Sequence, residues 1–160
     1  MRKLYLAYGS NMSEEQMAYR CPTAKLVGQS EIKDYELLFK GSGTGAYATV
    51  EPKKGKKVPV LIWDIGTLDE FQLDAYEGFP NFYYKKDISV LVNGEEEKAM
   101  VYIMDERRSL GCPSLAYYEV LEKAYRKFDF DMDILQEALG EHEKGRDCED
   151  EEWKYRHWGV

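Results

Sequence analysis

Residues 5–12 have the sequence YLAYGSNM, in which an apolar segment typical of a β-strand runs into a Gly-Ser-Asn turn. Two overlapping capping boxes, Asn11 with Glu14 and Ser13 with Gln16, predict that a helix follows this turn. Backbone N–H groups that converge at the start of a helix can hold a carboxylate or phosphate without a cationic side chain. The stretch therefore predicts an anion site, although Gly, Ser and Asn are also the ordinary residues of turns.

The rest of the chain alternates between strand and helix patterns. A Thr67–Glu70 capping box and a left-handed Gly78 bound one expected helix, and Asn93-Gly94 is a strong hairpin signal. The lysine-rich residues 53–57 are expected at the solvated tip of another hairpin. We expect strands at about 3–8, 31–40, 46–51, 58–66, 82–92 and 98–104, and helices at about 13–20, 67–77, 113–128 and 131–142.

Length and charge restrict the class of protein. A chain of 160 residues is close to the commonest size of a single domain. Its formal net charge of -8 disfavours a role in binding nucleic acid or an anionic membrane. No apolar run approaches the roughly 20 residues that span a bilayer, and the apolar stretch after the N-terminus is too short for a signal peptide. We therefore expect a cytoplasmic protein that does not bind membranes.

Potential metal ligands are sparse and poorly placed. The three cysteines are widely spaced, without a Cys-x-x-Cys pair, and do not indicate a zinc site. The two histidines, His142 and His157, fall in the charged C-terminal region, where a solvated helix end is the simpler interpretation. We expect neither a metal nor a cofactor.

The composition changes after residue 140. Residues 141–152 carry seven acidic side chains, which is typical of a solvated tail. Trp153, Tyr155 and Trp158 then follow within the last eight residues, and exposed tryptophan is unusual unless it docks against something. We expect a domain over residues 1–140 and a tail over residues 141–160. The tail should pack either on its own domain or on a second subunit, so the protein is expected to be a monomer or a homodimer.

Four short segments, read in order, resemble motifs of the γ-glutamylcyclotransferase-like superfamily over about residues 4–120. They are YLAYGSN at 5–11, GAYATV at 45–50, LDAYEGFP at 73–80 and PSLAY at 113–117. The resemblance implies an α+β fold with a small mixed β-barrel flanked by helices. It also implies a cofactor-independent enzyme that cyclises a γ-glutamyl amine or peptide to 5-oxoproline and releases the free amine.

The resemblance assigns the catalytic role to Glu77. In this reaction the α-amine loses a proton and attacks the γ-carbonyl, and the leaving nitrogen gains a proton; one carboxylate can carry that proton both ways. A carboxylate on the last turn of a helix faces the negative end of the helix dipole, which raises its pKa, and burial would raise it further.

The same resemblance implies the substrate-binding residues. The backbone of Tyr8, Gly9, Ser10 and Asn11 would hold the γ-glutamyl head, and Tyr117 would line the site. Tyr83 and Tyr84 must point to opposite faces of a strand, so only one of them can line the pocket, and we expect Tyr83.

Two other function classes stay open at this point. One is a hydrolase or acyltransferase acting on γ-glutamyl amides, and the other is a non-catalytic module that binds γ-glutamyl ligands. The sequence does not identify the leaving amine, although the net charge favours a neutral or cationic amine over glutathione.

Overall fold

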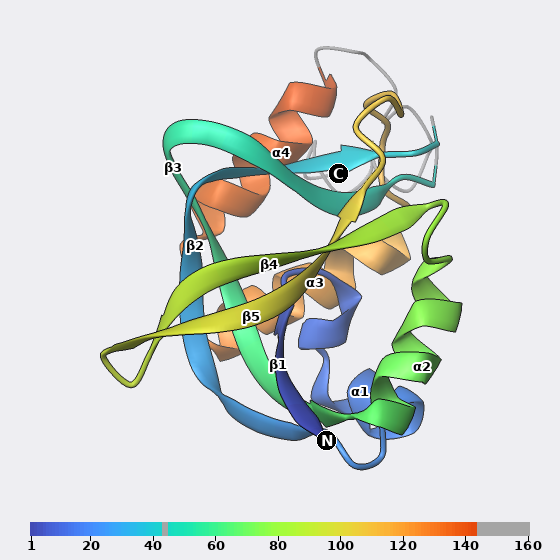
Figure 1. Ribbon diagram of the computed structural model, residues 1–160. Coiled ribbons are helices and arrows are strands. Elements are labelled where there is room, and N and C mark those ends of the chain that lie inside the picture. Colours follow the sequence, from blue (N-terminus) through green and yellow to red (C-terminus); the bar gives the residue numbers. More distant parts are fainter. Residues whose placement is uncertain (43–44, 144–160) are drawn as a thin grey trace.

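The computed structural model describes residues 1–42 and 45–143. In this part of the chain, five strands form one mixed sheet in the order β2-β3-β1-β5-β4, flanked by helices (Figure 1). The strands are β1 (Arg2–Ala7), β2 (Lys25–Lys40), β3 (Tyr47–Gly66), β4 (Tyr83–Val92) and β5 (Glu95–Met104). The helices are the 3-10 helix η1 (Ser10–Met12), α1 (Glu14–Arg20), α2 (Thr67–Glu77), α3 (Leu115–Lys127) and α4 (Met132–Glu143). The predicted α+β fold is confirmed.

Strand β1 lies at the centre of the sheet. It pairs antiparallel with β3, where Ala7 lies opposite Leu61, and parallel with β5, where Tyr5 lies opposite Met100. The outer pairs, β2 with β3 and β4 with β5, are antiparallel hairpins. The sheet curls so that its edge strands β2 and β4 come into contact, but the hydrogen-bonded order of the described strands ends at these two edges. The term barrel therefore describes the sheet only loosely.

The core lies around the central strands. Residues 58–63 of β3 form a continuous buried run because both faces of this strand are covered, and its branched residues suit a strand packed on two sides. Helix α4 packs against β2, and helix α3 packs against α4 and η1. This arrangement leaves the turn after β1 and the end of α2 to face one another over the sheet.

The expected hairpin tip at residues 53–57 is wrong. Strand β3 continues through this segment, and its pairing with β2 resumes with Lys57 opposite Lys33. The extra residues form a bulge, in which the Gly55 N–H donates to Asp34 Oδ1 at 2.9 Å and both residues have positive φ. The lysines are solvated on this bulge, and the chain reverses instead between β2 and β3, after Gly41.

Two expected helix caps also shift. Helix α2 is capped one residue earlier than predicted, since Asp69 Oδ2 accepts the N–H of Gly66 at 3.0 Å. Ser13 does cap α1 by accepting the N–H of Gln16, as expected, but Asn11 belongs to η1 and directs its side chain into the protein.

None of the described helices combines the length and apolar character needed to cross a bilayer. Residues 141–143 of the expected tail form the end of α4, and the rest of it, residues 144–160, lies outside the described residues, so the expected boundary at residue 140 stays a prediction.

Candidate active site

A cavity of about 380 Å³ opens between the turn after β1, the C-terminal end of α2 and the middle of the sheet. Its walls come from segments far apart in the sequence, and aromatic residues dominate them. The lining residues are Tyr5, Leu6, Tyr8, Gly9, Ser10, Asn11, Tyr47, Ala48, Ala75, Tyr76, Glu77, Gly78, Phe82, Tyr83, Tyr102 and Tyr117. Every site residue expected from the sequence is among them.

Glu77 is the last residue of α2. The helix ends there because Gly78 adopts the left-handed conformation with φ 66°, and the Phe79 N–H bonds back to the Asp74 carbonyl at 3.0 Å. The carboxylate accepts a long hydrogen bond of 3.5 Å from Asn11 Nδ2. Burial raises the pKa of the Glu77 carboxyl to about 7, while Arg20 acts to lower it. A carboxyl with this pKa can take up and return a proton near neutral pH.

The buried side chain of Asn11 forms hydrogen bonds with residues of three elements, β1, α1 and α2. Its Nδ2 donates to the Tyr5 hydroxyl at 2.9 Å as well as to Glu77, and its Oδ1 accepts from Arg20 Nη1 at 2.6 Å. Its backbone carbonyl accepts from Trp63 Nε1 at 3.0 Å. The sequence interpretation considered only the backbone and the capping role of Asn11, and it missed this side-chain contact with the candidate base.

The turn itself is a single 3-10 turn that precedes α1. The Met12 N–H donates to the Gly9 carbonyl and the Ser13 N–H to the Ser10 carbonyl, both at 3.0 Å. The N–H groups of Ser10 and Asn11 therefore lie at the open end of this turn, where the first donors of a helix are free for a ligand. Gly9 has φ -116° and ψ -138°, so its φ is negative and this turn does not need the left-handed conformation that favours glycine.

The hydroxyls of Tyr83 and Tyr117 both bond to the backbone of one residue of β3, Ala48. Tyr83 donates to the Ala48 carbonyl at 2.7 Å, and the Ala48 N–H donates to the Tyr117 hydroxyl at 3.1 Å. Because the Tyr117 oxygen acts as an acceptor here, its own proton can be directed to a ligand. Burial raises the pKa of both phenols above the usual value of 10, so both are neutral at physiological pH. Tyr84 lies on the other face of β4, where its hydroxyl donates to Glu106.

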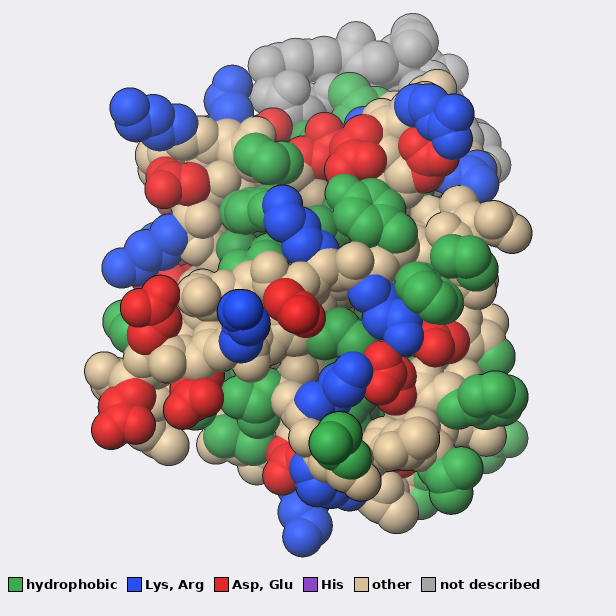
Figure 2. Space-filling model, in the orientation of Figure 1, with side chains coloured by type: hydrophobic (Ala, Val, Ile, Leu, Met, Phe, Trp, Pro, Cys, Tyr) green, Lys and Arg blue, Asp and Glu red, His purple; other side chains and the backbone are tan. Residues whose placement is uncertain are grey.

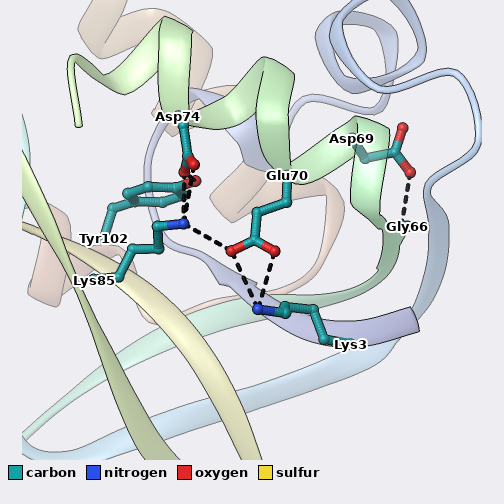
Figure 3. A network of polar contacts seen from close by, with 7 residues as sticks. All are labelled: Lys3, Gly66, Asp69, Glu70, Asp74, Lys85 and Tyr102. Carbon is teal, nitrogen blue, oxygen red and sulfur yellow. Dashed lines mark hydrogen bonds and ion pairs between the residues drawn. The ribbon is translucent and has the colours of Figure 1, made fainter. Parts of the chain in front are cut away.

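A polar network holds helix α2 against the sheet (Figure 3). Lys85 of β4 lies 2.8 Å from Glu70 and 2.9 Å from Asp74, and Lys3 of β1 lies 3.0 Å from Glu70. The hydroxyl of Tyr102, a residue of the cavity wall, donates to Asp74 at 2.5 Å. Glu70, Asp74 and Glu77 follow the i, i+4, i+7 spacing of one helix face, so the first two fix the helix and the third reaches the cavity. The face drawn in Figure 2 shows such acidic and basic side chains interspersed.

Several wall residues were not predicted from the sequence, namely Tyr5, Tyr47, Tyr76, Phe82 and Tyr102. Tyr102 could have been found, because the Asn93-Gly94 hairpin fixes the register that places it opposite Lys85. Tyr47 and Phe82 belong to an aromatic group at the cavity, where the rings of Tyr47 and Tyr117 pack edge to face at 5.2 Å. Within the described residues, no cluster of three or more metal-ligating side chains is present.

The family assignment comes from comparison with known proteins. A family model described as γ-glutamyl cyclotransferase, AIG2-like, matches residues 5–127, which include the turn, Glu77 and Tyr117. The chain belongs to this family. It is 31% identical to a γ-glutamylcyclotransferase of Bos taurus over 128 residues, which cover 74% of this chain and 67% of the relative. A γ-glutamylcyclotransferase of Homo sapiens is 29% identical over 127 residues, with the same coverage.

Solved structures show the same fold as this family member. A structure named γ-glutamyl cyclotransferase superposes with a TM-score of 0.77 at 23% identity, over 86% of each chain. A yeast γ-glutamyl cyclotransferase specific to glutathione gives a TM-score of 0.63 at 13% identity, over 89% of this chain and 96% of that one. Relatives with this name support an enzyme of the γ-glutamylcyclotransferase kind.

Proposed function

We propose that the protein cyclises a small γ-glutamyl amine to 5-oxoproline and releases the free amine, with Glu77 as the proton carrier. The observation that carries this proposal is the placement of Glu77, which has a raised pKa and lies in the same cavity as the Tyr8–Asn11 turn. The volume of about 380 Å³ is within the range of small-molecule sites and leaves room for an amine beyond the γ-glutamyl head.

In the proposed reaction the free N–H groups of Ser10 and Asn11 bind the α-carboxylate of the γ-glutamyl head. The Glu77 carboxylate takes a proton from the α-amine, and the amine nitrogen attacks the γ-carbonyl carbon to close a five-membered ring. The tetrahedral intermediate then collapses, the bond to the leaving nitrogen breaks, and protonated Glu77 gives its proton to that nitrogen. Since both reacting groups belong to one substrate, ring closure needs orientation only within that molecule.

Tyr117 and Tyr83 are proposed to orient the reacting carbonyl. The Tyr117 hydroxyl already accepts the Ala48 N–H, so its proton can point at the carbonyl oxygen as negative charge develops there. Tyr83 donates to the carbonyl of the same residue and so helps to fix the backbone to which Tyr117 is bonded.

The test is a screen of γ-glutamyl amines for 5-oxoproline release, read by mass spectrometry, with Glu77→Gln as the matched control. The glutamine is close to isosteric but cannot accept the amine proton, so turnover should fall by about 10²- to 10⁴-fold while the circular dichroism spectrum is kept. Release by the variant within a few-fold of wild type would contradict Glu77 as the proton carrier.

The same screen separates the alternatives. In water enriched in ¹⁸O, a hydrolase would release labelled glutamate, whereas cyclisation gives unlabelled 5-oxoproline. An acyltransferase would instead form a new γ-glutamyl amide when a second amine is supplied. A binding module would show none of these products but would still be stabilised against heat by γ-glutamyl ligands.

A further inference from the structure

Arg20 ends helix α1 and joins two walls of the cavity. Its Nη1 donates to Asn11 Oδ1 at 2.6 Å, and its Nη2 donates to the Tyr76 hydroxyl at 2.7 Å. The guanidinium also lies 3.7 Å from the centroid of the Tyr76 ring. Arg20 itself lines a separate groove between α1 and α3. Its contacts with the cavity are made through the turn, where it also lies 3.5 Å from the Ser10 hydroxyl, and through Tyr76, the neighbour of Glu77.

The contact with Arg20 sets the direction of the Asn11 amide. A primary amide carries a donor at one end and an acceptor at the other, so its neighbours determine which end points where. Arg20 has only donors, and the Asn11 oxygen must face it. The amide nitrogen then faces the other way, 3.5 Å from Glu77 Oε1 and 2.9 Å from the Tyr5 hydroxyl. Without Arg20, the amide could turn its oxygen toward the carboxylate.

We propose that Arg20 is a positioning residue which, through the Asn11 amide, holds Glu77 in the charged form that accepts the proton of the substrate amine. The inference rests on the proposed role of Glu77 as a base. It adds a residue that the sequence interpretation did not include in the site.

The other titratable groups that face Glu77 are phenols. They come from each element around the carboxylate, namely Tyr5 of β1, Tyr8 after it, Tyr83 of β4, Tyr102 of β5 and Tyr117 of α3. Burial raises the pKa of each phenol above 10, so all five stay neutral at neutral pH. Asp74, on the same helix as Glu77, is paired with Lys85. Among the described residues, Arg20 is therefore the charged group that opposes the effect of burial on the pKa of Glu77.

The first experiment compares pH profiles of kcat/KM for wild type and Arg20→Met. Loss of the cation and of the oriented amide donor should raise the pKa of Glu77, and the acidic limb should move to higher pH by about one unit. Well below that pKa, a shift of one unit lowers kcat/KM about tenfold, whereas the alkaline plateau should be kept within a few-fold. A purely structural role would instead lower the whole profile without moving its limb.

Lys127→Met is the matched control. Lys127 of α3 contacts Glu14 of α1 at 2.5 Å, so this variant also removes a cation and an anchor of α1, but it leaves Asn11 in place. Its acidic limb should coincide with that of wild type. Arg20→Lys keeps the charge but offers one donor nitrogen in place of the two that bond Asn11 and Tyr76, and its limb should lie between those of wild type and Arg20→Met.

A second measurement tests the effect of Arg20 on the pKa of Glu77 without relying on turnover. The Glu77 carboxyl is titrated by ¹³C NMR in the substrate-free protein, with Glu77→Gln used to assign the signal. A higher pKa in Arg20→Met and an unchanged one in Lys127→Met support the proposal. An unchanged Glu77 titration in Arg20→Met overturns it. If Arg20→Met does not fold, Asn11→Leu removes the same donor and must raise the pKa.

This titration separates the two proposals. If no γ-glutamyl amine gives 5-oxoproline but the Glu77 pKa still responds to Arg20, the proposed function fails while the electrostatic coupling stands. If 5-oxoproline forms and neither the limb nor the titration moves, the proposed function stands and the role of Arg20 fails.

Discussion

The side-chain amide of Asn11 donates to the carboxylate of Glu77 across 66 positions of sequence, at 3.5 Å. This contact joins the turn that is proposed to hold the γ-glutamyl head to the helix end that is proposed to move the proton. Each partner is held by a further contact. Arg20 bonds to Asn11, and the helix that carries Glu77, α2, forms ion pairs with Lys85. The two halves of the proposed chemistry are thus held at a set separation before any ligand arrives.

The raised pKa of Glu77 predicts a cost in stability at alkaline pH. The ordinary pKa of a glutamate carboxyl is 4.5, and burial raises the pKa of Glu77 in the folded protein to about 7, so the folded protein binds this proton more tightly than the unfolded chain. The stabilisation from this proton is complete below pH 4.5 and is lost as the pH rises through about 7. Glu77→Gln should therefore be more stable than wild type at pH 8, by at most about 3 kcal/mol, and nearly equal to it at pH 4.5. Urea unfolding at the two pH values measures this, and an equal difference at both would contradict it.

Gly9 should be important for substrate binding because it has no side chain. Its φ of -116° suits any residue, but a Cβ at this position would lie 3.0 Å from the Tyr117 hydroxyl. Overpacking of this kind costs about 1–3 kcal/mol, and Gly9→Val should therefore weaken substrate binding strongly. Ser10→Ala removes only long contacts, of 3.3 Å to Tyr76 and 3.5 Å to Arg20, and should change KM by a few-fold at most. Equal kinetic effects of the two variants would count against a site built from backbone amides.

A double mutant identifies the source of the Gly9 effect. If the clash is with the Tyr117 hydroxyl, Gly9→Ala should cost less in a Tyr117→Phe background than in wild type. Additive effects on kcat/KM would place the cause elsewhere, for instance in direct contact between the new methyl and the ligand.

Tyrosines inside and outside the cavity should differ in how much their hydroxyls contribute to kcat/KM. Tyr117→Phe should lower kcat/KM by about tenfold, which corresponds to the free energy of about one hydrogen bond. This loss is smaller than that expected for Glu77→Gln, because the packed ring of residue 117 stays in place. Tyr84→Phe is the matched control, since its hydroxyl bonds to Glu106 outside the cavity wall, and it should leave kcat/KM unchanged. A loss in Tyr84→Phe as large as in Tyr117→Phe would argue against this assignment.

The cavity predicts a preference among leaving amines. Among the described residues that line it, Glu77 is the charged one, and aromatic rings provide much of the remaining wall. Such a wall offers a carboxylate on the leaving group no cation, whereas it can accept a neutral or cationic amine. We therefore expect kcat/KM to be higher for γ-glutamyl derivatives of neutral or cationic amines than for glutathione, with added salt weakening the preference for cations.

The amine preference is checked by assaying both classes side by side at two ionic strengths. Glutathione as the best substrate would contradict it and would direct attention to a cation outside the lining. Arg108 is such a group, since its guanidinium lies 4.2 Å from the ring centroid of Phe82, a lining residue. Arg108→Gln would then be expected to remove the preference for glutathione.

The sequence predicted what depends on local signals. The left-handed Gly78 that ends α2 and the Asn93-Gly94 hairpin both need positive φ angles that few residues adopt, and the structure contains both. The turn after β1 was predicted from its Gly-Ser-Asn composition and is present as η1. The bulge at Asp34 and Gly55 was missed because a lysine-rich segment with a glycine has the composition of a turn. Only the pairing partner distinguishes a bulge from a turn in such a segment.

What could not be predicted depends on three-dimensional packing. Asn11 has the spacing of a helix cap, but burial beside Tyr5 and Arg20 gives its side chain other partners. The position of Glu77 at a helix end predicts a raised pKa, but the cause seen in the structure is burial, and burial depends on residues brought together by the whole fold. The roles of Glu77 and the tyrosines in catalysis stay predictions.

The central position of β1 has a consequence for how the chain is made. This strand is synthesised before both of its partners: its residues pair with β3 residues about 60 positions later and with β5 residues about 100 positions later, so one of its edges stays unpaired until β5 is made. Until β5 arrives, the β2-β3 hairpin can form without the β4-β5 hairpin, and β1 is the element that joins the two. A released chain that stops short of β5 would lack Tyr102 and Tyr117 of the pocket wall and would leave β1 with an open sheet edge, the kind of surface that recruits other strands.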